Sequence, residues 1–414
     1  MVDASLPGLY VHVPFCLSKC PYCDFSSSTD CARIPAWLTA LGKEAACYQN
    51  HFSPFDTLYL GGGTPSLLDP GQLAVIMQNL GRYFSFSPDT EVTLEANPDD
   101  LTPEKLRAYR DLGVNRLSVG VQSFHDHELA FLGRRHQAGQ TRQALISARA
   151  AGYKNLSLDL IYALPGQSLK DWTRTLEQAL SFDPEHLSCY QLTYEPGTPL
   201  GRRKKRGEVT PAGEEEERAF FLFTSRFLEE RGYEHYEISN FARRRGPGFE
   251  PCHSRHNRKY WGHLPYLGLG PGAHSFAGGV RWWNVSGVGQ YCRSLARGRA
   301  PLRAREALSG EQLRLEALYL GLRTKEGAPL DLLRRTPGGE QILAELQKSG
   351  LIEMNRDRVA PTRRGFLLAD NLPLRFMDGD PGEDTPYQSG PLRPPAPSPA
   401  PCRQITGAIH DTGG

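Results

Sequence analysis

The sequence predicts an α/β protein: an open (β/α)6 partial TIM-like barrel followed by a smaller α+β, winged-helix-like C-terminal domain. Three observations support this fold class. Apolar runs alternate with helix-like stretches through roughly the first 200 residues, as in parallel β/α units. Polar and glycine residues gather where those strands should end, and the carboxyl ends of parallel strands form the binding edge of such folds. Beyond residue 300, two helical stretches precede a short hairpin pattern.

The expected strands are short apolar runs, and each is followed by an amphipathic stretch with helical spacing. The strands are expected at 9–13, 57–60, 91–96, 116–120, 156–161 and 187–192, and the helices at 36–50, 71–83, 103–112, 141–151, 169–180 and 214–231. The last helix begins with four glutamates and ends at Arg-Gly, which suits the helix dipole. This alternation predicts a parallel sheet covered by helices.

The remaining segments predict four regions along the chain. We expect a core over residues 1–235, a connecting region rich in Gly, His and aromatic residues over 236–300, a C-terminal domain over 301–376 and a disordered tail over 377–414. The C-terminal pattern consists of helices at 310–322 and 340–349 and a hairpin at 351–360. A domain that packs beside the barrel is favoured over a DNA-binding winged helix. The tail is rich in Pro and Gly and too poor in apolar residues to fold.

Composition excludes several classes of protein. The net charge of +2 gives no general attraction to nucleic acid, and no apolar run is long enough to span a membrane. The basic run at 202–206 is therefore interpreted as part of a solvated loop over 196–211. The N-terminus is too short and polar for a signal peptide. Nine cysteines, three of them clustered, suit a reducing compartment, so we expect a cytoplasmic protein.

The most informative motif is Cys16-x3-Cys20-x2-Cys23, directly after the first expected strand. Three thiolates can hold three irons of a cubane cluster and leave the fourth iron open to a small molecule. A structural zinc site needs four ligands, and ferredoxin motifs use four cysteines at other spacings. Two alternatives stay open: zinc with His12 as the fourth ligand, and three unrelated buried thiols.

With these cysteines, the sequence resembles the radical S-adenosylmethionine (SAM) superfamily. Within it, the sequence resembles the family of oxygen-independent coproporphyrinogen III oxidases and HemW-type heme chaperones, over roughly residues 8–376. The resemblance implies a [4Fe–4S] cluster on Cys16, Cys20 and Cys23, with SAM bound at the open iron. In that superfamily, an electron from the cluster cleaves the SAM sulfonium. Such chemistry belongs to the cofactor, while the protein supplies position and shielding.

A glycine-rich turn follows the second expected strand, at Gly61-Gly62-Gly63-Thr64. Glycines let backbone groups approach a ligand closely, and no Gly-Lys-Ser/Thr follows that would make this turn a P-loop. The resemblance places this turn at the amino group of SAM. It implies further SAM-binding or cluster-side positions at Tyr10, Tyr22, Glu95, Gln122, Arg134, Asp159 and Thr193.

These positions have plausible physical roles. Asp159 at a strand end can accept hydrogen bonds from ribose hydroxyls, and Arg134 can pair with a carboxylate. The alternative for Glu95 and Asp159 is that they are ordinary strand-end acids. No residue is assigned as catalytic, and whether the protein is an enzyme is left open.

Two features distinguish the branches of the resembled family. The oxidases carry one more cysteine two residues after the third, where this chain has Phe25. The run from His256 to Trp261 fits the His-Asn-x-x-Tyr-Trp motif of the HemW branch. The resemblance therefore favours a heme chaperone over an oxidase that decarboxylates coproporphyrinogen III to protoporphyrinogen IX. A winged-helix regulator with a redox cluster is a third hypothesis, which salt-sensitive duplex binding would reveal.

His256 is the candidate axial ligand of heme iron, because neutral imidazole is a proper ligand. Tyr260, Trp261 and Tyr266 can pack against a porphyrin, and Cys252 and His253 are rival ligands. A lone histidine is more often structural. The implied partners are heme, an acceptor protein such as a respiratory membrane protein, an electron donor and a second copy of the chain, and no nucleic acid is expected.

Overall fold

The computed structural model describes residues 6–52, 54–246 and 250–377, and the structural statements below refer to these residues. A 12-stranded sheet forms the larger part, in the order β12-β11-β10-β9-β1-β2-β3-β4-β5-β6-β8-β7. Its first six strands in chain order run parallel to one another. They are β1 (Gly8–Val13), β2 (Phe55–Gly62), β3 (Phe86–Ala96), β4 (Arg116–Gln122), β5 (Leu156–Tyr162) and β6 (His186–Gln191). All six predicted strands are confirmed, and the sheet stays open.

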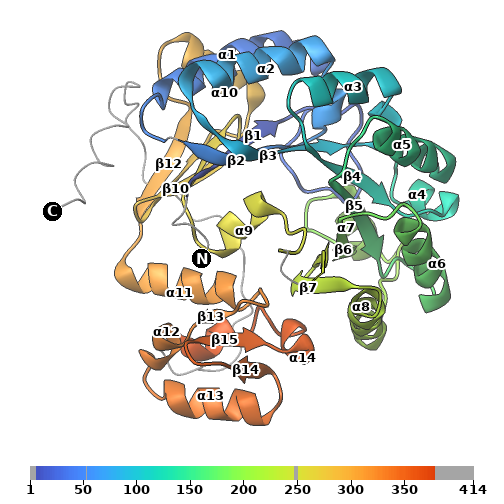
Figure 1. Cartoon of the computed structure of the whole chain (residues 1–414), viewed down its shortest axis with the longest axis vertical. Helices are drawn as coiled ribbons and strands as arrows, with labels where there is room; N and C mark the ends of the chain where they lie inside the picture. The colour runs from blue at the N-terminus through green and yellow to red at the C-terminus, as the bar shows by residue number, and fades with distance from the viewer. Residues whose placement is uncertain (1–5, 53, 247–249, 378–414) are drawn as a thin grey trace.

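Helices pack outside this parallel sheet (Figure 1). They are α1 (Ile34–Cys47), α2 (Pro70–Tyr83), α3 (Pro103–Asp111), α4 (Asp126–Phe131), α5 (Ala138–Ala150), α6 (Leu169–Leu180) and α8 (Glu214–Glu229), with the 3₁₀ turns η1 (Cys31–Arg33), η2 (Pro65–Leu67) and η3 (Pro98–Asp100). Several helices begin at a capping side chain: the Asp69 carboxylate accepts from the Gln72 amide, and the Ser168 hydroxyl accepts from the Asp171 amide. The six predicted helices are confirmed within a few residues.

Further strands, most of them antiparallel to their neighbours, extend both edges of the parallel sheet. On one edge, β8 (Asn240–Arg243) pairs with β6 and with β7 (Tyr233–Glu237). On the other edge, β9 (Tyr266–Leu269) pairs with β1, and β10 (His274–Ala277), β11 (Val280–Asn284) and β12 (Leu302–Ala307) follow. Helices α9 (Arg255–Trp261) and α10 (Val288–Ala296) lie in the same stretch. The boundary predicted at residue 235 thus falls inside β7, and the region 236–300 continues the sheet instead of merely connecting two domains.

One expected loop is partly helical. Within the stretch 196–211, helix α7 spans Pro199–Lys205 and carries most of the basic run. The Thr198 hydroxyl accepts from the Gly201 amide at 3.0 Å, and Pro199 occupies the first helical turn. Proline at that position suits a helix start because its missing N–H needs no partner there. The loop prediction was therefore wrong over these seven residues.

The C-terminal part forms a second body below α9 in Figure 1. It contains α11 (Gly310–Gly321), β13 (Ala328–Pro329), α12 (Leu330–Arg334), α13 (Gly339–Lys348), β14 (Ile352–Met354), β15 (Arg358–Pro361), α14 (Arg363–Phe366) and η4 (Pro373–Phe376). Its apolar cluster, which includes Leu318, Leu333 and Phe376, is separate from the main core. The predicted helices and hairpin are present, but β12 belongs to the large sheet, so this body begins after residue 307.

Of the predicted tail 377–414, only Met377 is among the described residues. No helix in the described parts of the chain has the length and apolar character needed to cross a membrane.

Candidate functional site

The three motif cysteines lie in the loop that follows β1, and all three are half-buried. The Cys16 amide donates to the Ser28 carbonyl at 3.0 Å, which fixes the start of the loop. Two side chains outside the loop donate to thiol sulfurs: Thr64 Oγ1 to Cys16 Sγ at 3.4 Å, and Arg134 Nη1 to Cys20 Sγ at 3.6 Å. Two of the three sulfurs therefore have polar neighbours, which is unlike thiols packed in an apolar core.

The zinc alternative does not fit this geometry. His12 is 7% exposed, and its ring nitrogens contact the Tyr10 hydroxyl at 3.0 Å and the Ser26 carbonyl at 2.8 Å. No three His, Cys, Asp or Glu side chains converge on a single ion anywhere in the described ranges. Because both ring nitrogens of His12 are in hydrogen bonds, His12 is not free to serve as the fourth zinc ligand.

The glycine turn lies beside the cysteine loop and has no room for side chains. A Cβ added at Gly62, whose φ is +110°, would lie 2.5 Å from the His12 ring. A Cβ at Gly63 would lie 2.6 Å from the Phe15 carbonyl oxygen, and one at Gly61 would lie 2.8 Å from the Tyr59 ring. These glycines therefore bring backbone amides against the loop at the end of β2, as a ligand-facing turn requires.

Two carboxylates lie inside the barrel: that of Glu95, beside the glycine turn, and that of Asp159, in the middle of the sheet. Glu95 accepts from the Tyr59 hydroxyl at 2.8 Å and from the Gly62 amide at 3.0 Å. Asp159, which lies within β5 and not at its end, accepts from the Ser118 hydroxyl at 3.3 Å. Burial raises the pKa of both acids, and that of Asp159 reaches about 7 with a further contribution from the Glu95 charge. Strongly raised pKa values are common at functional sites.

Arg134 joins the cysteine loop to the strand ends. Besides Cys20, its guanidinium donates to the Gly120 carbonyl at 2.9 Å and to Asn97, and it lies against Tyr22. Its buried Nε has no partner among the described residues. An unsatisfied guanidinium N–H in this position fits the pairing with a ligand carboxylate that the resemblance implies.

Two further predicted positions, Gln122 and Thr193, differ in how exposed they are to solvent. Gln122 ends β4, is 9% exposed and adopts a left-handed backbone with φ of +63°. A glutamine in that region is uncommon, and such conformations cluster at functional sites. Thr193 lies just beyond β6 and is exposed.

His256 lies on α9 beneath the barrel and is almost fully buried, at 1% exposure. Its Nδ1 contacts Thr57 Oγ1 at 2.8 Å, and its Nε2 contacts the Tyr260 hydroxyl at 2.8 Å. Its ring stacks on Tyr59 at 5.1 Å, and Tyr59 also holds Glu95. Burial lowers the pKa of His256 to about 3, so the ring is neutral. Both ring nitrogens of His256 are therefore in hydrogen bonds. Tyr59 connects the motif histidine to Glu95, a candidate SAM-binding residue.

The rival ligands are partly engaged: Nδ1 of His253 is buried and has no hydrogen-bond partner among the described residues. His253 Nε2 pairs with Glu234 at 3.0 Å, and the His253 ring stacks on Tyr236 at 4.1 Å. Cys252 is buried, and its sulfur accepts from Arg245 Nε at 3.0 Å. Phe25, at the position of the oxidases' further cysteine, is 68% exposed.

Sequence reasoning missed Arg116, which is 1% exposed at the start of β4. Its charge opposes the effect of burial by lowering the pKa of Glu91, Glu95 and Asp159. Arg116 thus compensates a group of buried acids inside the barrel. The sequence feature that could have revealed Arg116 is a charged residue at the first position of an otherwise apolar strand.

Comparison with known proteins agrees with this geometry. Residues 10–179 match the family described as the radical SAM superfamily. The chain is 38% identical to the heme chaperone HemW of Mycobacterium tuberculosis over 88% of this chain and 93% of that protein, and 35% identical to HemW of Bacillus subtilis over 90% and 99%. The chain belongs to the HemW family of radical SAM proteins. Phe25 and the His256 motif agree with that membership.

The solved structure of coproporphyrinogen III oxidase (HemN) from Escherichia coli superposes with a TM-score of 0.77 over 90% of each chain, at 24% identity. This likeness confirms the fold, with its open sheet and its C-terminal domain. It carries no information on which reaction the HemW family member performs.

Proposed function

We propose that this chain is a cytoplasmic heme chaperone that binds heme, carries a SAM-ligated [4Fe–4S] cluster and transfers heme to an acceptor protein. The observation that carries the proposal is the His256 motif on α9, held against the barrel in a chain of the HemW family with Phe25 at the position of the oxidases' further cysteine. A respiratory membrane protein is the acceptor that we propose, together with an electron donor and a homodimeric state.

Each group of residues has a proposed role at the cofactor site. Cys16, Cys20 and Cys23 hold the cluster, and the donors Thr64 and Arg134 stabilise the thiolates. The glycine turn and Arg134 receive the amino and carboxylate groups of SAM, and Glu95 and Asp159 accept from its polar groups. Tyr10, Tyr22, Gln122 and Thr193 complete the surroundings. When bound, the cluster and SAM supply one-electron chemistry at the sulfonium.

The motif predicts His256 as the heme-iron ligand. Both of its ring nitrogens are in hydrogen bonds, so ligation by Nε2 requires that the Tyr260 hydroxyl be displaced. The neutral state of the ring favours ligation, because only an unprotonated nitrogen binds iron.

An anaerobic hemin titration of cluster-loaded protein, followed in the Soret band, tests the chaperone function. We expect saturation near one heme per chain and subsequent transfer to an apo-hemoprotein. Absence of specific binding, together with anaerobic turnover of coproporphyrinogen III to protoporphyrinogen IX, would overturn the proposal in favour of the oxidase.

The cluster assignment has its own test. Replacing Cys16, Cys20 and Cys23 together by alanine should abolish the visible absorbance of the cluster after reconstitution, because no thiolates remain to hold its irons. Replacing Cys292, a partly buried cysteine on α10 outside the motif, is the matched control and should leave the cluster unchanged. Retention of the cluster in the triple variant would contradict the assignment.

A further inference from the structure

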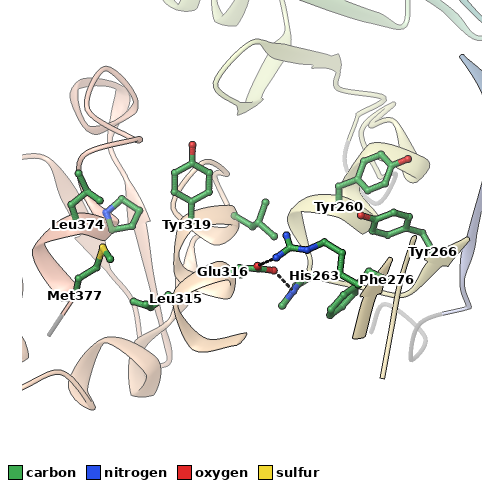
Figure 2. A pocket seen from close by; sticks show the side chains of 12 residues that line it. Tyr260, His263, Tyr266, Phe276, Leu315, Glu316, Tyr319, Leu374 and Met377 are labelled. Carbon is green, nitrogen blue, oxygen red and sulfur yellow. Dashed lines mark hydrogen bonds and ion pairs between the residues drawn. The ribbon is translucent and has the colours of Figure 1, made fainter. Parts of the chain in front are cut away.

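A cavity of about 540 Å³ lies between the large sheet and the C-terminal body, and no role described so far uses it (Figure 2). Its volume falls in the roughly 300–1,000 Å³ range of small-molecule sites. One wall comes from α9, β9, β10 and β11, with Tyr260, Tyr266 and Phe276. The opposite side comes from α11 and η4, with Tyr319, Leu374 and other residues.

The rim of this cavity exposes large apolar side chains to solvent. Tyr319 is 42% exposed, Leu374 57% and Met377 48%. A cluster of exposed apolar residues around a concave surface is costly in a free protein and marks a binding site. Aromatic walls favour a flat, apolar ligand, because ring faces pack on ring faces.

One histidine in the wall is already arranged as a metal ligand would be. Nε2 of His263 lies 3.2 Å from a carboxylate oxygen of Glu316, and the other oxygen of Glu316 lies 2.7 Å from Arg281. The His263 ring stacks on Phe276 with centroids 4.3 Å apart. Metal-binding histidines commonly donate one N–H to a carboxylate, which fixes the tautomer and leaves the other nitrogen for the metal. Nδ1 of His263 has no hydrogen-bond partner in the described part of the chain.

The backbone at His263 adds a second observation. Its φ is +52°, and it follows the last turn of α9, a position where glycine is preferred. Histidine is among the few non-glycine residues enriched at positive φ, so the helix ending is compatible with this residue. Its side chain is explained by what it contacts: Phe276, Glu316 and the cavity.

The cavity also touches the HemW-branch motif. Tyr260 lines the cavity with its ring while its hydroxyl contacts His256 Nε2 at 2.8 Å. The same tyrosine therefore separates the buried motif histidine from the accessible one. A ligand in the cavity would meet His263 without any displacement of the His256 hydrogen bonds.

Resting on the proposed function, we propose that this cavity is the heme site and that His263, in place of the motif histidine His256, ligates the iron through Nδ1, with the macrocycle packed between Tyr260, Tyr266 and Tyr319. Glu316 is a positioning residue that holds the ring of His263. Arg281, which pairs with Glu316 and Glu306, is the cation in the cavity lining that a heme propionate would meet. The site spans the barrel edge and the C-terminal body, so heme binding would connect the two.

The test is the hemin titration of cluster-loaded, full-length protein in four forms: wild type, His263→Gly, His256→Ala and His127→Ala. Glycine is compatible with the positive φ at residue 263, so this variant should fold. We expect His263→Gly to weaken heme binding at least about tenfold and to lose the visible and Soret spectrum of imidazole-ligated heme. Added imidazole should restore that spectrum by occupying the vacated space. The exposed His127 on α4 controls for non-specific heme binding and should behave as wild type.

Two further variants separate the effect of iron ligation by His263 from the effect of the space inside the cavity. Leu315→Trp should fill the cavity and reduce heme affinity while leaving His263 in place. Glu316→Gln should keep binding but raise the heme reduction potential, because the ligand loses the carboxylate that increases its basicity.

The outcomes are distinguishable. If wild type binds heme and His263→Gly binds it with the same affinity and spectrum, the cavity proposal is wrong while the chaperone function stands. If His256→Ala alone loses the spectrum of imidazole-ligated heme, the iron ligand is the motif histidine and the cavity proposal is also wrong. If wild type binds no heme, the proposed function itself fails.

Discussion

Asp159 illustrates how a single residue couples stability to function. Burial, reinforced by the charge of Glu95, raises its pKa from 3.8 to about 7. The folded protein therefore binds this proton more tightly than the unfolded chain does. As pH rises from about 4 to about 7, ionisation of Asp159 progressively lowers the free energy of unfolding, and above pH 7 the loss is complete. At neutral pH and above, the carboxylate therefore destabilises the apoprotein, as expected for a ligand-binding group.

We predict that Asp159→Asn raises the melting temperature of the apoprotein at pH 8 and has little effect at pH 5, where the wild-type acid is already protonated. The same variant should bind SAM more weakly, because an amide accepts less well than a carboxylate from ribose hydroxyls. Thermal unfolding at both pH values and calorimetric SAM binding measure the two effects. A melting-temperature difference independent of pH would show that Asp159 is not the group that titrates.

At the scale of elements, buried polar contacts connect segments that are far apart in the chain. Glu44 of α1 is fully buried and accepts from the Gly270 amide at 2.8 Å, from Asn284 of β11 and from the Tyr291 hydroxyl of α10. These bonds hold the β9–β11 edge against the first helix. That edge forms one wall of the cavity, so Glu44 supports the wall from behind.

Glu44→Ala should lower the free energy of unfolding by roughly 2–4 kcal/mol, because it leaves buried donors on three elements without an acceptor. Lys43→Ala, one residue earlier on the exposed face of the same helix, is the matched control and should change it by less than about 0.5 kcal/mol. Urea unfolding gives both values. Equal effects of the two substitutions would contradict a structural role for the Glu44 contacts.

The elements that sequence patterns predicted best are those with local causes. Apolar runs and amphipathic periodicity located the strands and helices of the barrel, because each must bury one face against its neighbours. Helix α7 was missed because a basic run dominates its composition, although Thr198-Pro199 is a recognisable helix start. The strands of the region 236–300 were missed because their short, aromatic-rich pattern lacks a clear period.

At the scale of the whole molecule, the described residues form three apolar clusters, and polar contacts join the one in the C-terminal body to the large sheet. Arg323 pairs with Glu237 at 3.6 Å, Lys325 with Glu234 at 2.5 Å, and the Lys325 amide donates to the Tyr236 carbonyl at 2.9 Å. The cations of these pairs are partly exposed to solvent, which limits what each pair contributes to the free energy of unfolding. The smaller C-terminal core should therefore open more readily than the barrel.

Hydrogen exchange of the apoprotein should show slower exchange in β1–β6 than in α11–α14, because local opening of the smaller core costs less free energy. Hemin should selectively slow exchange in α11, since a ligand in the cavity contacts both bodies. Exchange of α2, on the far side of the sheet from the cavity, is the internal control. Uniform protection throughout the chain would contradict two separately opening units.

The sequence by itself determined the alternation of strands and helices, the cysteine motif and the branch of the family, because each depends on residue spacing along a short stretch. Only the tertiary structure decided what surrounds each side chain. It placed Arg116 among buried acids, engaged both nitrogens of His256, and brought α11 and η4 opposite Tyr260 and His263 to form the cavity. Those relations join residues up to about 200 positions apart in sequence, and they arise from how the sheet and the C-terminal body pack, which no local pattern encodes.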